Sequence, residues 1–497
     1  MSSTSVVEIA SLIGAGLSGD PDVSVTGVSL DSTAIKSGEL FAALPGRSMH
    51  GARFVEEAIG RGASAIVTDS AGIQLIEKID ISLSVPILQV SDPRACLGAL
   101  CKLVYGDPAS DMILIGVTGT NGKSTTTSMI YQAARAVGMS AGLIGTLATL
   151  INDEKVVSAR TTPEAPDLFR TLARMKEAGV KIIAMEVSSI AVAEHRVDGL
   201  QFDCVAFTNL SHDHLDYHGS MSEYFFAKAR LFTQEFARYA LICTDSHWGI
   251  ELCNKVKIPY ETVGTVGSPD WKISRSNENS VTPSWKIDGP RGEIQFDSLA
   301  LPGKMNVVNA ALALSVLDRV GIRGKNVVEA ICKATVPGRG ELVGKRGDIS
   351  LFVDYAHSPE SIEEFLTGLK NEFRGRIITV LGAGGDRDAS KRVAMGRVSA
   401  NLSDIVIVTD DNPRSEDPSE IRKQIIQGVE EFSNALVVEI GDRREAITHA
   451  LEMAVGNDVV AILGKGHERG QEIMGRTIAF SDVDVVGELL GREDSHD

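Results

Sequence analysis

The sequence contains no apolar run of about eighteen residues, the length that a membrane-spanning helix requires. Its first residues, Met1–Ser5, also lack the basic and apolar regions of a secretory signal peptide. Hydrophobic residues make up 43% of the chain and charged residues 23%, which is typical of a soluble globular protein. We therefore expect a cytoplasmic protein that does not insert into membranes.

Basic residues are fewer than acidic ones. The chain has 49 Lys and Arg against 66 Asp and Glu, a formal net charge of −17. Because binding to a phosphate backbone requires basic surface, this balance argues against general nucleic-acid binding. It leaves open an anionic small-molecule substrate, which needs only a few Lys or Arg at one place.

No two of the six cysteines form a CxxC pair, so they are interpreted as reduced thiols and not as a metal site or disulfide framework. The histidines also fail to form a recognisable zinc motif. His212, His214 and His218 lie near Asp213 and Asp216 but lack the helical spacing of HExxH, and no cysteine joins them. This disfavours structural zinc and favours a divalent-ion site that uses His214.

With 497 residues, the chain is expected to form several domains. Strand-like and helical segments alternate, which predicts α/β domains with mostly parallel sheets. We place boundaries after Gly106-Asp107-Pro108 and at Pro337. The predicted domains are a small N-terminal α/β domain (1–110), a central P-loop ATPase-like domain (111–337) and a C-terminal Rossmann-like domain (338–497).

The most informative segment is Gly116–Thr125, with the sequence GVTGTNGKST. It follows a predicted buried strand, Met112–Gly116, and leads into a predicted helix, 124–137. Backbone N–H groups and Lys123 at such a turn would bind nucleotide phosphates, while the hydroxyl of Ser124 or Thr125 would hold Mg²⁺. Val117 stands where the strict Walker pattern has glycine, so this is a shorter variant. A plain structural turn is the alternative.

Other polar residues lie at predicted strand ends, where ligands of parallel sheets gather. Glu186 would lie near the phosphate loop and ligate Mg²⁺ if its strand neighbours the loop strand; otherwise it is a solvated acid. Arg387 and Arg414 follow two later strands, and together they would suit a ligand with more than one carboxylate. Either arginine could instead pair with its adjacent acids. Spacing alone gives Lys228, on a predicted helix, no role beyond that of a solvated lysine.

Five ordered motifs together resemble the Mur ligases, and within that family the enzymes of the tripeptide-forming step. The motifs are Gly119–Ser124, Glu186–Ser189, Asn209–His218, Asp354–Pro359 and Asp411–Arg414. The resemblance implies an ATP-dependent, ADP-forming ligase of cytoplasmic peptidoglycan synthesis. ATP would phosphorylate the D-glutamyl carboxylate of UDP-N-acetylmuramoyl-L-alanyl-D-glutamate, and the amine of an amino acid would attack the acyl phosphate.

The resemblance also assigns residues to this chemistry. The nucleotide would be bound by Gly119, Thr120, Asn121, Gly122, Lys123, Ser124 and Thr125, and by Asn309, Arg339, Asp354 and His357. Magnesium would be held by Ser124, Glu186, His214 and Lys228, the last as a carbamylated lysine, and Lys123, Glu186, His214 and Lys228 would be the catalytic set. The UDP-linked substrate would be bound by Ser29, Thr161, Thr162, Ser188, Glu194 and Arg196.

The amino acid would be bound by Arg387, Asp411, Asn412, Arg414, Gly464 and Glu468. In the family, Asp-Asn-Pro-Arg marks enzymes that add meso-diaminopimelate, because the arginine binds a carboxylate that lysine lacks. We therefore expect meso-diaminopimelate as the amino-acid substrate, in a monomeric enzyme. An enzyme that adds L-lysine remains open if Arg414 points away from the substrate. A non-catalytic, nucleotide-switched binding module is a further alternative.

The sequence departs from the family pattern at a few positions. Thr33, Ile190, Glu194 and Ala389-Ser390 replace the usual residues. These departures bear on individual contacts, chiefly to the UDP-sugar, and not on the reaction class. We also expect the outer domains to close on the central one about hinges near Asp107 and Pro337. Small-angle scattering of free and liganded protein would test that expectation.

Overall fold

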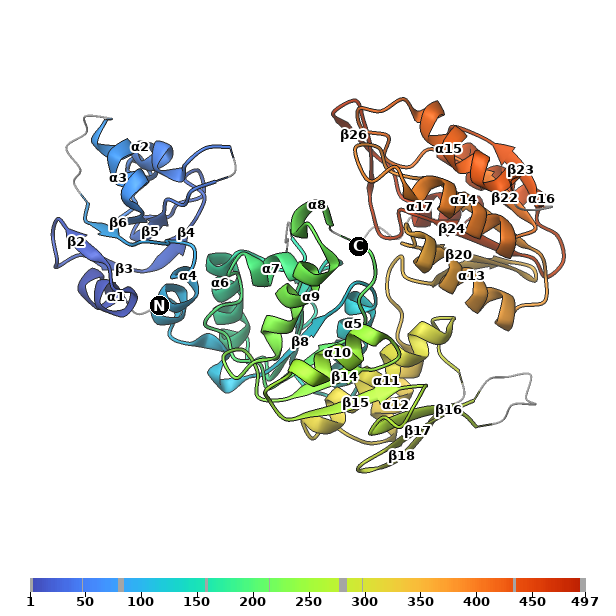
Figure 1. The fold of residues 1–497 in the computed structure, drawn as a ribbon, viewed down its shortest axis with the longest axis horizontal. Helices are drawn as coiled ribbons and strands as arrows, with labels where there is room; N and C mark the ends of the chain where they lie inside the picture. Colours follow the sequence, from blue (N-terminus) through green and yellow to red (C-terminus); the bar gives the residue numbers. More distant parts are fainter. Residues whose placement is uncertain are drawn as a thin grey trace. The chain divides into compact units, whose positions relative to one another are not determined.

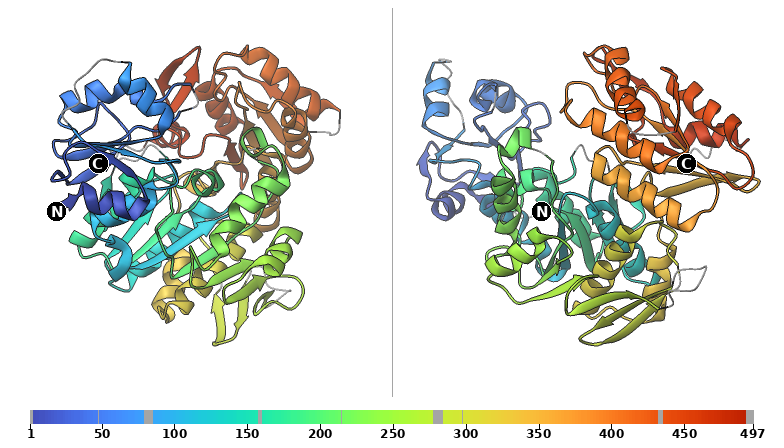
Figure 2. Two further views of the ribbon diagram at one scale, coloured as in Figure 1. Left: turned by 60° about the vertical axis from the view of Figure 1, so that its left-hand side comes forward. Right: turned by 45° about the vertical axis from the view of Figure 1, so that its right-hand side comes forward.

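A computed structural model describes residues 3–46, 48–78, 85–156, 160–213, 215–276, 284–296, 298–431 and 435–491. The chain divides into two compact units. The first comprises Met1–Lys272 and Leu312–Val327, and the second comprises Ile273–Ala311 and Val328–Asp497. Figure 1 labels the elements, and Figure 2 shows them from two further directions.

The first hundred residues form a five-stranded sheet in the order β2-β7-β6-β5-β4. Its strands are β2 (Gly16–Ser18), β4 (Gly27–Ser29), β5 (Glu39–Ala42), β6 (Ala65–Thr68) and β7 (Ile87–Gln89), and its helices are α1 (Val6–Ile13), α2 (Val55–Gly60), α3 (Ser70–Glu77) and α4 (Leu97–Tyr105). The apolar residues between 24 and 30 do not form one continuous strand. The structure instead has β3 (Ser24–Val25) paired with β1 (Thr4–Ser5), and β4 paired with β5, because the chain changes partner after Val25.

The central sheet of the first unit is mostly parallel, as predicted. Its strand order is β11-β10-β9-β12-β8-β13-β14-β15, with β16 next to β15. The strands are β8 (Ile113–Thr118), β9 (Ala141–Ile144), β10 (Thr149–Ile151), β11 (Glu154–Val156), β12 (Ile182–Glu186), β13 (Cys204–Phe207), β14 (Ala240–Cys243), β15 (Tyr260–Gly264) and β16 (Trp271–Arg275). The helices are α5 (Lys123–Ala136), α6 (Ala165–Glu177), α7 (Ser189–Ala193), α8 (Leu215–His218), α9 (Met221–Ala229) and α10 (His247–Lys255).

The position of β8 follows from its composition. Apart from Ile113, every residue of this apolar strand is buried, which requires cover on both faces and a neighbour on each edge. It pairs in parallel with β12 on one side and with β13 on the other. Consequently the carboxyl ends of three central strands, and the loops that follow them, meet at one edge of the sheet.

The second unit contains two short strands that pair antiparallel. They are β17 (Trp285–Gly289) and β18 (Gly292–Phe296). The helices α11 (Lys304–Arg319) and α12 (Lys325–Lys333) follow in the chain, and the segment Leu312–Val327, which includes parts of both, belongs to the first unit. The main sheet of the second unit has the order β19-β20-β24-β21-β22-β23. The strands are β19 (Glu341–Arg346), β20 (Ile349–Asp354), β21 (Ile377–Leu381), β22 (Ile405–Val408), β23 (Leu436–Glu439) and β24 (Val459–Leu463), and the helices are α13 (Pro359–Glu372), α14 (Lys391–Leu402), α15 (Pro418–Glu430), α16 (Arg443–Met453) and α17 (Asp482–Leu489).

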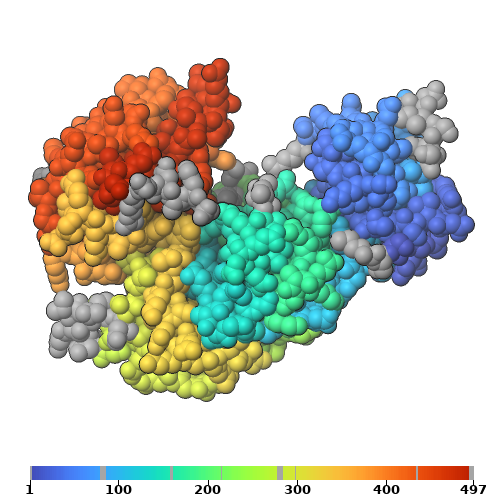
Figure 3. Space-filling model, turned by 180° about the vertical axis from the view of Figure 1, so that it is seen from behind, coloured from blue at the N-terminus to red at the C-terminus, as the bar shows by residue number. Residues whose placement is uncertain are grey.

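Helices cover both faces of this sheet, so the strands bury alternate residues in two different cores. Val406 and Val408 of β22 pack with α13, α14 and α15, whereas Ile405 and Ile407 pack with α16 and α17. This two-sided burial explains why the strands read as continuous apolar runs. The space-filling view in Figure 3 shows the same chain from behind. The α/β fold class, with small N-terminal, central and C-terminal sheets, is confirmed.

Within the described ranges, no helix combines the length and apolar composition needed to cross a membrane.

Candidate active site

The phosphate-loop segment connects β8 to α5, as predicted. Gly119 has a φ of 150°, and a Cβ at this position would lie 1.9 Å from Oγ1 of Thr208. Gly122 has a φ of 84° and caps the amino terminus of α5. Both glycines are therefore required by the backbone. The loop is placed so that the N–H groups at the start of α5 are available to an anion.

Residues after β13 hold this loop in place. The side-chain oxygen of Asn209 accepts a hydrogen bond from the N–H of Asn121 at 3.0 Å, and the hydroxyl of Thr208 donates to the carbonyl of Asn121 at 2.6 Å. The carbonyl of Asn209 accepts from the N–H of Thr120. Sequence reasoning gave Thr208 no role, although Asn209 begins one of the five motifs.

Glu186 lies beside the loop, because β12 pairs with β8 in a register that puts Glu186 opposite Val117. Its carboxylate is buried and accepts hydrogen bonds from the hydroxyl of Ser124 at 2.9 Å and from the N–H of Thr146 at 2.8 Å. The alternative of a solvated acid is therefore wrong. A hydroxyl and a carboxylate oxygen are the donors that Mg²⁺ prefers, so Ser124 and Glu186 fit this ion.

Two lysines meet at the same loop. The ammonium of Lys123 donates to the carbonyls of Gly119 and Thr120, at 3.0 and 2.9 Å. Nζ of Lys228, on α9, donates to the carbonyl of Gly119 at 2.9 Å and lies 4.6 Å from the ring centre of Tyr224. Lys228 is only 2% exposed, so it is not the solvated lysine that its spacing suggested.

The pKa of Lys228 lies well below the ordinary lysine value. Burial is the main cause, and the nearby charge of Lys123 adds to it, while Asp213 acts in the opposite direction. The amine is therefore neutral over a wider pH range than a solvated lysine, which makes it a better nucleophile.

The histidines do not form a zinc site among the residues that the structure describes. His218 is buried, and its Nε2 lies 2.9 Å from the hydroxyl of Ser189, while His212 is exposed. No group of three metal-binding side chains occurs within the described ranges. His214, expected as a magnesium ligand, lies outside the described residues.

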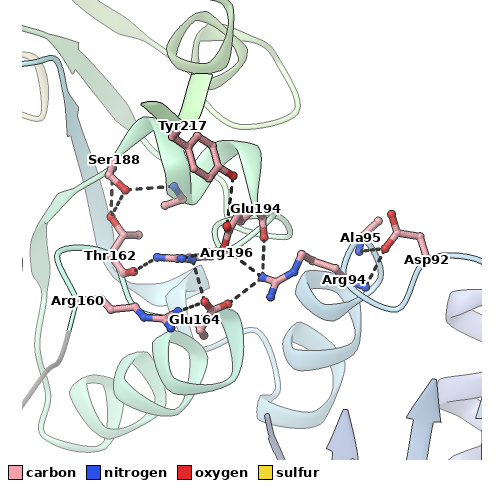
Figure 4. Close-up of polar contacts among 11 residues, drawn as sticks. Asp92, Arg94, Ala95, Arg160, Thr162, Glu164, Ser188, Glu194, Arg196 and Tyr217 are labelled. Carbon is pink, nitrogen blue, oxygen red and sulfur yellow. Dashed lines mark hydrogen bonds and ion pairs between the residues drawn. The ribbon is translucent and has the colours of Figure 1, made fainter. Parts of the chain in front are cut away.

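The residues expected to bind the UDP-linked substrate fall into two places. Thr162, Ser188, Glu194 and Arg196 lie around the ends of α6 and α7 (Figure 4), and the hydroxyl of Thr161 lies 2.9 Å from that of Thr146. Thr162 donates to the carbonyl of Glu186 at 2.9 Å and so connects this group to the phosphate loop. Ser29 instead ends β4 in the first sheet, where its hydroxyl exchanges two hydrogen bonds of 3.1 Å with the backbone of Asp31.

In the second unit, Arg339, Asp354 and His357 lie around Tyr355. The guanidinium of Arg339 stacks 4.2 Å from the Tyr355 ring centre, and the His357 ring lies 4.7 Å from it. Asp354 accepts hydrogen bonds from the N–H groups of Gly340 and Ala356, yet burial raises its pKa to about 6. Asn309, on α11, donates to Asn306 on the same helix.

His467 joins this cluster, although sequence reasoning assigned it no role. Its ring lies 5.2 Å from that of Tyr355, and its buried Nδ1 has no hydrogen-bond partner among the described residues. Burial, together with the charge of Arg339, lowers its pKa to about 4.

The loops after β22 and β24 meet as predicted, and a buried lysine joins them. Lys465 is fully buried, and its ammonium donates to Asp411 at 3.1 Å, to Asn412 at 3.0 Å and to Glu468 at 3.3 Å. Asn412 also donates to Glu468 at 2.8 Å. Gly464 has a φ of 111°, and a Cβ there would lie 2.9 Å from the Asp411 carboxylate.

Arg414 contacts Glu472 of a β-hairpin and the carbonyl of Gly385, and not the acids next to it in the sequence. Its Nε donates to Glu472 at 3.0 Å, and its Nη1 donates to the carbonyl of Gly385 at 2.6 Å. Glu472 lies on β25 (Gly470–Ile473), which pairs with β26 (Arg476–Ala479). Arg387 lies exposed on the loop after β21. Sequence reasoning missed Lys465 and Glu472, and both contact predicted residues.

Three domain families match successive parts of the chain. The Mur ligase family catalytic domain matches residues 24–105, the Mur ligase middle domain matches 117–317, and the Mur ligase glutamate ligase domain matches 338–466. The chain belongs to the Mur ligase family. The resemblance carried by the five motifs is thereby confirmed.

Individual Mur ligases are similar over nearly the whole chain. The UDP-N-acetylmuramoyl-L-alanyl-D-glutamate–2,6-diaminopimelate ligase of Corynebacterium glutamicum is 42% identical over 477 residues, which cover 94% of this chain and 92% of that protein. The UDP-N-acetylmuramyl-tripeptide synthetase of Leifsonia xyli is 39% identical, covering 96% and 94%. A solved structure of a UDP-N-acetylmuramoyl-L-alanyl-D-glutamate–2,6-diaminopimelate ligase matches with a TM-score of 0.69 and 28% identity, and the match covers 99% of both chains.

Proposed function

We propose that the protein is an ATP-dependent ligase of peptidoglycan synthesis that joins meso-diaminopimelate to UDP-N-acetylmuramoyl-L-alanyl-D-glutamate and releases ADP and phosphate. The observation that carries the proposal is the buried contact of Ser124 with Glu186 at the phosphate loop, beside Lys228, in a chain that matches diaminopimelate ligases over its length. Because ATP and a UDP-linked precursor are cytoplasmic compounds, we place the activity in the cytoplasm, and we propose that the enzyme works as a monomer.

The proposed reaction has two steps. The D-glutamyl carboxylate attacks the γ-phosphorus of ATP, which forms an acyl phosphate and releases ADP. The amine of the amino acid then attacks the acyl carbon, so that a C–N bond forms, phosphate leaves and the amine loses a proton. Because a carboxylate and an amine condense too slowly in water, the first step supplies a leaving group.

The phosphate loop provides the groups that bind the ATP phosphates. The N–H groups at the start of α5 lie at the positive end of the helix dipole, and the ammonium of Lys123 adds a full positive charge. Ser124, Glu186 and His214 are the residues that would hold Mg²⁺. When bound, the ion neutralises charge on the phosphates during transfer.

Lys228 is the residue that would become carbamylated. Its buried amine, in the neutral form, would attack the carbon of CO₂. An N–C bond forms, the electrons of one C–O π bond move to oxygen, and the nitrogen loses a proton, so the neutral amine becomes an anionic carbamate. A lowered pKa favours this step, since only the neutral amine is nucleophilic. The new anion would lie near Lys123 and help to hold a divalent cation.

The second unit would choose the amino acid. Arg414 offers a guanidinium to the carboxylate that diaminopimelate has and lysine lacks, while Asn412 and Glu468 offer an amide and an acid to its distal ammonium. A lysine substrate would leave Arg414 without that carboxylate. We therefore propose that the enzyme discriminates against lysine. In the same unit, the adenine nucleotide would be contacted by Asn309, Arg339, Asp354 and His357.

The proposal is tested with purified protein, ATP, Mg²⁺, the UDP-linked dipeptide and a panel of amino acids, following phosphate release and product mass. Phosphate release that requires the dipeptide and meso-diaminopimelate together is the expected result. Preference for L-lysine would keep the ligase and change its substrate. ATP turnover that ignores both partners would instead support the nucleotide-switched binding module.

A further inference from the structure

Arg196 lies at the centre of an ion-pair cluster that extends into the N-terminal part of the chain (Figure 4). Its Nη2 donates to Glu194 at 2.8 Å, its Nη1 donates to the carbonyl of Thr162 at 3.2 Å, and its Nε lies 3.0 Å from Glu164. The guanidinium is mostly buried, so these contacts fix its orientation.

Arg94 contacts both of these acids. Its Nη1 donates to Glu164 at 3.1 Å and to the carbonyl of Glu194 at 3.3 Å, and it lies 3.7 Å from the Glu194 carboxylate. The turn that presents Arg94 is itself fixed, since Asp92 accepts hydrogen bonds from the N–H groups of Arg94 and Ala95. Arg94 is therefore preorganised toward the acids.

Glu194 is the member of the cluster that places a second carboxylate beside Arg196. Burial opposes its ionisation, but the hydrogen bond from Arg196 and the charges of Arg196 and Arg94 outweigh burial and lower its pKa. Tyr217 also donates to it, at 3.2 Å. A charged Glu194 competes with an anionic substrate for Arg196, a conflict that glutamine would avoid.

The charge balance shows how the conflict is resolved. Three guanidiniums, those of Arg94, Arg160 and Arg196, form ion pairs with two carboxylates, those of Glu164 and Glu194, so one positive charge is in excess within these pairs, while Asp92 is bound to backbone N–H groups. Without Arg94, two guanidiniums would face two carboxylates and no excess would remain. The net attraction for a carboxylate ligand thus depends on Arg94.

We infer that Arg94 is a positioning residue that holds Glu164 and Glu194 so that Arg196 can bind a carboxylate of the UDP-linked dipeptide. This inference rests on the proposed function. Arg94 does not touch the reacting atoms; it acts through the two acids. Arg94 has this role because position 194 carries an acid, and with a neutral residue there the role would be weaker.

The test is a double-mutant cycle with Arg94→Ala and Glu194→Gln in the full-length protein, with KM measured separately for the dipeptide, ATP and meso-diaminopimelate. Arg94→Ala should raise KM for the dipeptide about tenfold and leave kcat and the other two KM values within about twofold. The same substitution in the Glu194→Gln background should have a clearly smaller effect, because the acid to be neutralised is gone. The control is Arg174→Ala, a substitution on α6 that breaks an exposed pair with Glu154 of β11.

Melting temperatures of all variants accompany the kinetics. An equal effect of Arg94→Ala in both backgrounds would overturn the inference, as would a fall in kcat and melting temperature with no change in the KM for the dipeptide. If the wild-type protein shows no dipeptide-dependent turnover, the proposed function fails instead, so the two failures are distinguishable.

Discussion

The hydroxyl of Ser124 donates a 2.9 Å hydrogen bond to Oε2 of Glu186, a carboxylate that is 2% exposed. This contact exists because β8 and β12 are parallel neighbours, so that the residue ending one strand lies against the first turn of the helix that follows the other. A buried carboxylate is costly unless it is compensated, and Thr146 supplies a further N–H. The pair brings two oxygen donors to the place where the ATP phosphates are proposed to bind.

Glu186→Gln tests this pair. The amide keeps the shape and can still accept from Ser124, but it removes the negative charge that would balance a divalent cation. We expect kcat for phosphate release to fall about 100-fold and the Mg²⁺ concentration needed for half-maximal rate to rise. A magnesium titration of both proteins measures this, with Glu154→Gln on the exposed strand β11 as control. An unchanged magnesium dependence would contradict a metal role for Glu186.

Lys228→Ala tests the proposed carbamate. The substitution removes both the amine and any carboxylate formed on it, so turnover should be nearly lost. Added formate should restore the rate about tenfold from that low level, since a diffusible carboxylate lacks the positioning of a tethered one. Wild-type protein depleted of CO₂ should lose activity and regain it with bicarbonate. Lys255→Ala, at an exposed helix end, should respond to neither treatment.

Much of the fold was predictable because strand periodicity and turn residues are local. The strand preceding the phosphate loop was predicted within two residues of its observed bounds. The rule that parallel strands present their carboxyl ends together predicted Glu186 near the loop only on the condition that its strand neighbours β8, and the structure meets that condition. These features depend on short segments whose composition alone limits their structure.

The supporting residues were not predictable, because their roles come from partners distant in sequence. Lys465 contacts Asp411, which lies 54 residues earlier, and Arg414 contacts Glu472, which lies 58 residues later. A lysine in a Gly-Lys-Gly segment has no local sign of full burial. Likewise, nothing near Arg94 indicates that it meets Glu164 across 70 residues.

Lys465→Met should destabilise the protein, because it leaves the nearly buried Asp411 without its cation. Breaking a buried pair from one side costs about 3 to 5 kcal/mol, so the melting temperature should fall clearly. The KM for meso-diaminopimelate should rise as well, since Asn412 and Glu468 lose a shared anchor. Thermal unfolding and kinetics measure the two effects.

The double variant Lys465→Met with Asp411→Asn is the matched control. It removes the stranded charge, so it should recover part of the lost stability. If the double variant is less stable than Lys465→Met alone, the interpretation of an uncompensated Asp411 is wrong.

Glu364 gives a pH dependence. Burial raises its pKa from 4.5 to about 7, although a backbone N–H of Met305 and the charge of Lys304 partly oppose this. Because the folded state binds the proton more tightly than the unfolded state, this contribution to stability is fully present below about pH 4.5 and is lost as the pH rises through 7. Glu364→Gln should therefore flatten the fall in melting temperature between pH 5 and about pH 8.

The neighbouring Glu363 supplies the control for this measurement. It is exposed on the same helix, α13, so Glu363→Gln is the matched substitution against which the pH profile of Glu364→Gln is compared. Equal profiles for wild type and Glu364→Gln would show that the Glu364 carboxyl does not titrate in the folded state as described.

Arg414 and Glu472 together test how the amino acid is chosen. Arg414→Ala removes the guanidinium proposed to bind the distal carboxylate, so KM for meso-diaminopimelate should rise about 100-fold while the KM values for ATP and the dipeptide stay unchanged. Discrimination against L-lysine should fall, because lysine never used that contact.

Glu472→Gln should produce a smaller shift in the same direction, since an amide oxygen can still accept from Nε but no longer balances its charge. Arg444→Ala, which breaks an exposed pair with Glu488, is the control. A strong preference for meso-diaminopimelate that survives in Arg414→Ala would mean that selection resides elsewhere, with Arg387 the next residue to substitute.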